Sequence, residues 1–384
     1  MTPRDASLAG GGAGFAIFYA YLGRSRARNE RTARRCLEEA MGALAAARMG
    51  PSFYGGFAGI GWATAHLERQ LFESDSWNST ETIDEALAVY VGRPGWRREY
   101  DLISGLVGLG VYALERLPAP CAVACVEGIV DRLEEISERT GEGIVWHTAP
   151  ELLPPWQREQ CPNGYDNLGL AHGVPGVIAF LGAAWAAGIR KRTARKLLGG
   201  AVAWLLRHKR RSRSGSRFSA WIVPGGDGED CRSAWCYGDP GVAAALLCAA
   251  RGVGEPAWER AALNIARRAA ARRPEETNVQ DAGLCHGAAG LAHVFNRMYQ
   301  ATGDASLRRA ARYWIGRTLA MRRRGRGIGG FQTLQIREDK TTYWEDDPGL
   351  LTGSAGIGLA LLAAATPIEP AWDRMLLLSN PIPR

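Results

Sequence analysis

The amino-acid sequence predicts an all-α protein with the fold of a double-layered α/α toroid, or barrel, that has seven inner helices. The main observation is a repeated Gly-x-x-Gly pair, after which the chain continues with small and apolar residues. These segments are apolar almost all round, as expected of buried helices. The pairs begin at Gly11, Gly56, Gly105, Gly173, Gly238, Gly287 and Gly353. Successive pairs lie 45 to 68 residues apart, within or somewhat above the range of helical repeats.

The second observation is that charge-rich segments alternate with the apolar ones. Their apolar residues recur at helical spacing, which predicts amphipathic helices over 31–48, 79–91, 120–139, 190–207, 256–272 and 305–321. We therefore expect an inner ring of helices wrapped by an outer ring, in a single domain over residues 1–384. The glycines would let neighbouring helices approach closely and let the backbone turn sharply before each inner helix.

Three irregular stretches interrupt this alternation, at 141–167, 214–231 and 325–349. We expect them to form loops or short strands at the mouth of the toroid, where binding functions usually lie. The first glycine pair begins so early that little room remains for an outer helix before it. Either the toroid is shortened at its N-terminus or the start of the chain is misassigned.

Composition indicates a globular protein of the cytoplasm. Of the 384 residues, 46% are hydrophobic and 22% are charged. No apolar run reaches the roughly 18 to 20 residues that a membrane span needs, and the first residues lack the pattern of a secretory signal. The eight cysteines are scattered, and two of them lie in glycine-rich strings, which favours a reducing compartment over a disulfide framework.

The net charge of +8 comes largely from arginine, with clusters at 207–213, 272–273 and 322–324. Two interpretations stay open. The clusters are solvated helix ends and loops, since cations suit helix C-termini, or they attract an acidic partner such as an acidic peptide. Nucleic acid is not an expected partner, because no binding motif accompanies the charge.

Two thiols and an imidazole occupy matching places in consecutive repeats. Cys236 lies two residues before Gly238, and Cys285, followed by His286, lies two residues before Gly287. Equivalent positions of neighbouring repeats tend to fall side by side in a closed helical array, so we expect these three residues to meet. Two cysteines and a histidine suit a zinc site with one open position. The other six cysteines are interpreted as structural.

Four more residues precede glycine pairs and are candidates for catalysis. They are Asp101, His172, Arg232 and Tyr237. His172 could instead be a satisfied structural histidine, and Asp101 a helix cap or a partner of Arg98. For Arg232 and Tyr237 a functional and a structural role stay equally open.

Four strings of the sequence carry a resemblance that covers nearly the whole chain. NLGLAHGVPG, RSAWCYGDPG, LCHGAAGLA and YDLISGLVGLG resemble the motifs of the lanthionine synthetase C-like family, the lanthipeptide cyclases. The resemblance implies addition of a peptide cysteine thiol to dehydroalanine or dehydrobutyrine, which forms (methyl)lanthionine thioether rings. It implies one Zn²⁺ per chain, held by Cys236, Cys285 and His286.

The family's other site residues carry over to the four candidates. His172 would protonate the enolate, Asp101 would take the thiol proton or orient His172, and Arg232 and Tyr237 would stabilise developing charge. The implied partners are a dehydrated precursor peptide with an acidic leader and a complex with a dehydratase and a transporter, which would bring this cytoplasmic protein to the membrane periphery.

Three other functions stay open. A zinc-dependent protein prenyltransferase also alkylates a zinc-bound thiol in an α/α barrel, but its usual ligand set includes an aspartate. A relative that adds glutathione to dehydroalanine peptides would form no rings. A catalytically silent peptide-binding subunit would need neither zinc nor His172.

Overall fold

The computed structural model describes residues 3–23, 27–46, 48–70, 80–211, 215–223, 228–337 and 339–379. The chain divides into two compact units. Unit 1 contains residues 1–80 and 273–372, and unit 2 contains residues 81–272 and 373–384. The single domain expected over residues 1–384 stays a prediction.

Helices form at each place where the sequence predicts them. The apolar segments are the helices α2 (Gly12–Gly23), α4 (Phe57–Gln70), α6 (Leu106–Arg116), α9 (Val174–Ala186), α11 (Asp239–Val253), α13 (Ala288–Thr302) and α15 (Ser354–Ala365). The charge-rich segments are α3 (Ala27–Ala46), α5 (Glu81–Gly92), α7 (Pro120–Glu135), α10 (Lys191–Arg207), α12 (Pro256–Ala270) and α14 (Ala305–Ala320). Residue 79, where one of these was expected to begin, lies outside the described residues.

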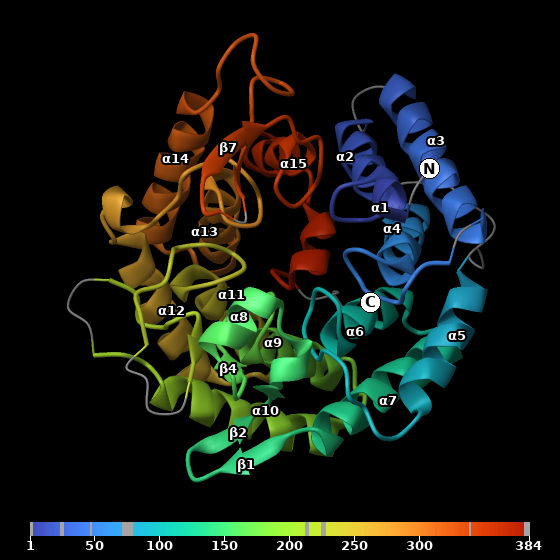
Figure 1. Cartoon of the computed structure of the whole chain (residues 1–384), viewed down its shortest axis with the longest axis vertical. Coiled ribbons are helices and arrows are strands. Elements are labelled where there is room, and N and C mark those ends of the chain that lie inside the picture. Colours follow the sequence, from blue (N-terminus) through green and yellow to red (C-terminus); the bar gives the residue numbers. More distant parts are fainter. Residues whose placement is uncertain are drawn as a thin grey trace. The chain divides into compact units, whose positions relative to one another are not determined.

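Within each unit the apolar helices contact one another in a row. In unit 1 the row runs from α4 through α2 and α15 to α13, so the first and last repeats of the chain are neighbours. In unit 2 the row runs from α6 through α9 to α11. In five cases the charged helix packs against the apolar helix before it, as α3 does on α2 and α14 on α13, whereas α5 packs on α7 (Figure 1). The alternation along the sequence is therefore an alternation of two layers.

The turn before an apolar helix caps that helix with its own carbonyl groups. The N–H of Val107 donates to the carbonyl of Tyr100 (3.0 Å), and that of Ser354 to the carbonyl of Asp347 (2.9 Å). A hydrogen bond from an N–H group to the carbonyl seven residues earlier also occurs at the starts of α4, α11 and α13. It satisfies N–H groups that a helix start otherwise leaves unpaired. Accordingly, α6, α9, α11, α13 and α15 use no side-chain cap.

This close return of the chain explains the second glycine of the pair. A Cβ on Gly59 would lie 1.9 Å from the carbonyl oxygen of Phe53, and one on Gly241 would lie 2.1 Å from that of Trp235. A Cβ would likewise lie too close to the carbonyl oxygen six residues earlier in the chain at four other second glycines, Gly14, Gly176, Gly290 and Gly356. The neighbouring repeat also approaches, since Leu8 lies 2.9 Å from the same point on Gly59. The glycines thus serve both expected purposes, a sharp turn and a close neighbour.

Main-chain hydrogen bonds join the turns of neighbouring repeats. Tyr54, Ala9, Leu351 and Cys285 all lie two residues before the first glycine of their repeats. The N–H of Ala9 donates to Tyr54 (3.0 Å), that of Leu351 to Ala9 (3.1 Å), and that of Cys285 to Leu351 (2.7 Å). Within unit 1, equivalent positions of neighbouring repeats therefore lie side by side.

The irregular stretches contain small antiparallel sheets, as expected. The strands are β1 (Glu138–Thr140), β2 (Gly143–Val145), β3 (His147–Thr148), β4 (Tyr165–Asn167), β5 (Trp221–Ile222), β6 (Thr333–Ile336) and β7 (Thr342–Glu345). They pair as β1 with β2, as β3-β4-β5, and as β6 with β7. Strand β4 immediately precedes the turn of the fourth repeat, and β5, which pairs with it, follows α10 in the chain.

Two short α-helices complete the described chain, α1 (Pro3–Ala6) and α8 (Pro155–Gln160), and 3-10 turns lie at Pro150–Leu152, Pro274–Glu276 and Ala371–Leu376. The helix α1 packs on α2 and α3. Among the described residues, no helix combines the length and the apolar character that crossing a membrane requires.

Replacing Gly59 by alanine should lower the free energy of unfolding by about 3 kcal/mol, because the methyl group meets a backbone carbonyl that cannot move aside. The matched control is Gly42→Ala in the middle of α3, where a Cβ meets nothing within 4 Å. That change should stabilise by about 0.5–1 kcal/mol, since glycine is a poor helix former. Chemical denaturation of both variants would measure this, and equal effects would contradict the explanation.

Candidate functional site

Three turns of unit 2 carry the predicted catalytic residues. Asp101 lies in the turn before α6, His172 in the turn before α9, and Cys236 with Tyr237 in the turn before α11. These turns are joined as in unit 1: the N–H of Leu102 donates to Ala171 (3.1 Å), and that of Ala171 to Cys236 (3.2 Å).

Asp101 holds His172 from a fixed position. One carboxylate oxygen of Asp101 accepts hydrogen bonds from the N–H groups of Ser104 (2.8 Å) and Gly105 (3.0 Å). The other oxygen lies 2.6 Å from Nδ1 of His172. Asp101 is buried, whereas 41% of the His172 side chain is exposed. The imidazole is thus anchored through Nδ1, and among the described residues its Nε2 has no partner.

Asp101 also sets the protonation of His172. Burial lowers the pKa of His172, but the hydrogen bond and charge of Asp101, together with the charge of Cys236, outweigh burial and raise the pKa. The imidazole therefore stays protonated, and able to donate from Nε2, up to a higher pH than a free histidine would.

Tyr237 stacks on His172 and is held there by Asn167. The two rings have centroids 5.9 Å apart and planes 23° apart. The buried amide of Asn167 donates from Nδ2 to the Tyr237 hydroxyl (3.1 Å), and its Oδ1 accepts from the N–H of Gly169 (2.8 Å). Burial raises the pKa of Tyr237, and the bond from Asn167 only partly offsets this. Tyr237 therefore stays a neutral phenol.

Asn167 is a residue that the sequence reasoning missed, although a signal for it exists. Asn167, Asp281 and Asp347 each lie six residues before the first glycine of their repeat. In each, the side-chain oxygen accepts a hydrogen bond from the N–H two residues later. This local turn is typical of Asn and Asp. Only an amide can close the turn and also donate to Tyr237.

Arg232 occupies the same place in the fifth repeat, where the fourth, sixth and seventh repeats have Asn or Asp. Its carbonyl oxygen lies 2.0 Å from the Cβ that Gly238 would carry, and Gly238 has a φ of +87°, which favours glycine. Within the described part of the chain, the guanidinium of Arg232 forms no hydrogen bond or ion pair with Asp101, His172 or Tyr237. The structure therefore brings together three of the four catalytic candidates, and the role of Arg232 stays a prediction.

A second histidine pair was not expected from the sequence. Nδ1 of His147 on β3 lies 2.9 Å from a carboxylate oxygen of Asp166 on β4, and Nε2 lies 2.9 Å from the carbonyl of Asn163. Burial lowers the pKa of His147, but the hydrogen bonds to Asp166 and Asn163 and the nearby negative charges together outweigh burial and raise the pKa. With both ring nitrogens occupied, His147 stabilises the small sheet.

The predicted metal ligands of unit 1 lie in the turn before α13. Cys285 and His286 are half-buried there, and the N–H of Cys285 bonds to the neighbouring turn at Leu351. Buried Tyr54 lies close by: burial raises its pKa, and the charge of Cys285 raises it further.

Comparison with known proteins identifies the family. The model of the family described as lanthionine synthetase C-like protein matches residues 2–377. The chain belongs to the lanthionine synthetase C-like family. No curated protein sequence matches it.

Among solved structures, the chain is similar to nisin cyclase, with a TM-score of 0.81 and 19% sequence identity over 98% of this chain and 93% of that chain. This likeness confirms the fold class predicted from the sequence, a mostly helical toroid fold.

In this lanthionine synthetase C-like chain, Cys236 of unit 2 and Cys285 and His286 of unit 1 offer two sulfurs and one imidazole nitrogen. By donor type, thiolate sulfur and imidazole nitrogen suit zinc better than the oxygen-seeking ions magnesium and calcium. Cys236 is buried, with 6% exposed.

Replacing Asp101 by asparagine should lower the pKa of His172, because the amide removes the charge that outweighs burial. In the folded protein this pKa is raised. The pair therefore stabilises the fold fully below the unfolded pKa of about 6.5, and the contribution is lost as the pH rises through the folded value. NMR titration of the imidazole signals measures the shift.

The matched control is Asp166→Asn, which should lower the pKa of His147 and leave His172 unchanged. An unchanged His172 pKa in Asp101→Asn would contradict the assignment.

Proposed function

We propose that the protein is a zinc-dependent lanthipeptide cyclase. It would add the thiol of a peptide cysteine to a dehydroalanine or dehydrobutyrine of the same peptide, closing a thioether ring. The observation that carries this proposal is the pair of Asp101 and His172, which aims an unpartnered Nε2 from the turn beside the one that carries Cys236. Membership of the lanthionine synthetase C-like family supports it.

The zinc ligands of the proposal are Cys236, Cys285 and His286. Cys236 and Cys285 both lie two residues before the first glycine of their repeats, the position whose main-chain groups join neighbouring turns within each unit. A bound zinc ion would supply a site that binds the substrate thiol and lowers its pKa, so that a thiolate forms at neutral pH.

His172 supplies the proton in this proposal. The thiolate attacks the β-carbon of the dehydro residue, the C–S bond forms, and the electron pair of the double bond moves toward the α-carbon. His172, protonated and held through Nδ1, gives its Nε2 proton to that carbon. The substrate thiol's own proton restores the imidazolium, so the addition balances. General acid catalysis of this kind accelerates a reaction roughly a hundred- to ten-thousand-fold.

Tyr237 and Arg232 would stabilise the negative charge that develops on the substrate carbonyl. Tyr237 stays protonated because its pKa is raised, and its hydroxyl oxygen already accepts from Asn167, so its own proton is available for donation. A preorganised donor of this kind is the usual device for stabilising an oxyanion.

We infer that the substrate is a dehydrated precursor peptide with an acidic leader, supplied by a dehydratase, in the cytoplasm. A complex with that dehydratase and a transporter would place the protein near the membrane. The net charge of +8 supports attraction of an acidic peptide.

Purified protein should contain about one zinc per chain, as the open three-ligand site requires. Cys236→Ala should lose the metal and His172→Ala should retain it, and both should cyclise a dehydrated peptide at least about a hundredfold more slowly. Metal analysis and mass-spectrometric assay of free thiols measure the two effects. The matched control is Cys121→Ala, a half-buried cysteine of α7, which should keep both zinc and activity.

The outcomes also separate the alternatives. Ring formation by Cys236→Ala would reject the proposal and favour a silent peptide-binding subunit. Addition of glutathione to the dehydrated peptide without rings would favour a glutathione-adding relative, and alkylation by a prenyl diphosphate would favour a prenyltransferase.

Affinity for a precursor with an acidic leader should fall as salt is added, because salt screens the attraction between the leader and the positively charged protein. Fluorescence anisotropy of the labelled peptide at low and high ionic strength measures this. A leader with its acidic residues changed to amides is the control and should show little dependence. Equal affinity at all salt concentrations would refute the electrostatic contribution.

A further inference from the structure

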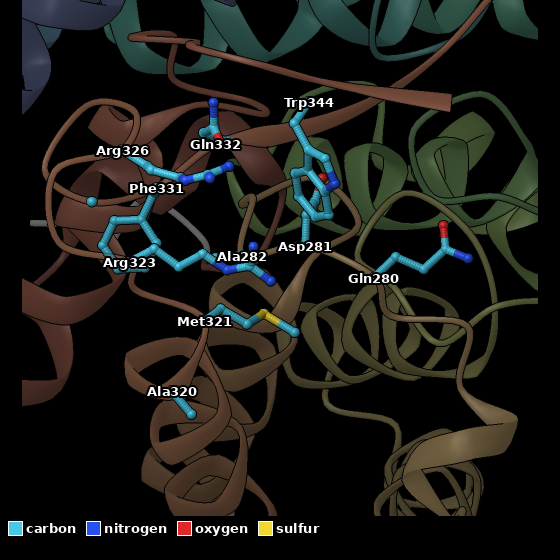
Figure 2. A pocket seen from close by; sticks show the side chains of 11 residues that line it. Gln280, Asp281, Ala282, Ala320, Met321, Arg323, Arg326, Phe331, Gln332 and Trp344 are labelled. Atoms are coloured by element: carbon cyan, nitrogen blue, oxygen red, sulfur yellow. The ribbon is translucent and has the colours of Figure 1, made fainter. Parts of the chain in front are cut away.

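A cavity of about 220 Å³ lies in unit 1 beside the turn that leads to Cys285 (Figure 2). Its walls come from 280–282 in that turn, from the C-terminal end of α14, from the loop 323–332 and from Trp344 on β7. The volume is below the roughly 300–1,000 Å³ of sites for drug-sized ligands. It therefore suits one or two amino-acid side chains better than a nucleotide or an organic cofactor.

Two arginines with uncommitted guanidinium groups line this cavity. Figure 2 shows Arg323 and Arg326 extending toward the side of the cavity where Trp344 lies. Among the described residues, neither guanidinium has a hydrogen-bond or ion-pair partner, whereas the neighbouring Arg322 bonds to the carbonyl of Gly329 (2.8 Å). Two unpaired guanidinium groups at one cavity offer the planar, bidentate geometry that a carboxylate accepts.

The remaining walls offer apolar contact. Three apolar side chains line it: Trp344, which is 49% exposed, buried Phe331, and Met321 at the end of α14. A large indole left half-exposed beside cationic groups is typical of binding surfaces. The cavity thus combines a recognition point for one negative charge with a surface for an apolar side chain.

The acidic groups around the cavity argue against a polyanion. Asp281 lines the cavity, but its oxygens accept from the N–H groups of Gly283 (3.1 Å) and Leu334 (3.2 Å). Asp346 accepts from the amide of Gln332 at the rim (2.8 Å). These two carboxylates beside the cavity disfavour a nucleic-acid backbone, which would bring several negative charges next to them.

We propose that this cavity binds an aspartate or glutamate side chain of the peptide substrate, with a neighbouring apolar side chain against Trp344. This inference rests on the proposed function, which makes a peptide the substrate. The cavity lies on the same turn as two proposed zinc ligands, since the N–H of Ala288 bonds back to the carbonyl of Asp281 (2.9 Å) and so closes the segment that contains them. An acidic side chain bound in the cavity would therefore hold the peptide beside the turn that carries Cys285 and His286.

The test is binding of the blocked tripeptide acetyl-Leu-Glu-Leu-amide to the full-length protein, followed through the indole N–H signal of Trp344. The variant Trp344→Phe assigns that signal. The glutamate peptide should shift it saturably, and acetyl-Leu-Gln-Leu-amide should bind at least about tenfold more weakly, because a charge-assisted pair is replaced by a neutral one. Arg323→Gln and Arg326→Gln should each weaken glutamate binding about tenfold.

The matched control is Arg324→Gln, an exposed arginine of the same loop that does not line the cavity, and it should leave affinity unchanged. Equal binding of the two peptides, or an equal loss in Arg324→Gln, would overturn the proposal. Tighter binding of inorganic phosphate or of a hexanucleotide would overturn it in favour of a phosphate site. Zinc content and ring formation, measured on the same variants, distinguish failure of this inference from failure of the cyclase proposal.

Discussion

The fold of this protein depends on one local interaction, the closure of each turn onto the helix that follows it. Carbonyl groups of the turn receive the first N–H groups of the apolar helix, and the backbone comes so close that a glycine is required where it passes, as at Gly59 and Gly241. The same geometry lets neighbouring turns bond to one another through the main chain. Any residue placed in such a turn is therefore fixed against its neighbours by backbone, whatever its side chain.

That constraint explains why the sequence predicted so much of the fold. Glycine pairs before apolar segments are a visible consequence of the turn closure, and the alternation of apolar and charged segments follows from two layers. It also explains why Cys236 and Cys285 stood out, since both occupy the position at which turns are joined. Asp101 and His172 lie in turns of consecutive repeats, but four residues and one residue before their glycines, so only the family resemblance suggested that the two act together.

Other parts of the site depend on contacts that the spacing of residues along the sequence does not predict. Asn167 reaches Tyr237 only because β4 ends where it does, and His147 meets Asp166 through the pairing of β3 with β4. Short strands inside long loops carry little periodic signal, so their partners cannot be read from alternation. The cavity at Arg323 and Arg326 is of the same kind, because its four wall segments share no sequence pattern and meet only in the folded chain.

The constraint that builds the fold also orients the proposed catalyst. Asp101 uses one oxygen to close the turn before α6 and the other to hold His172, so the imidazole is aligned by a group that the helix start itself immobilises. Asn167 does the same for Tyr237, closing its turn with Oδ1 and positioning the phenol with Nδ2. In both cases a turn-forming side chain has a second hydrogen-bonding atom, and that atom sets the geometry of the reacting groups. The orientation that catalysis needs is thus a product of the folding interaction rather than an addition to it.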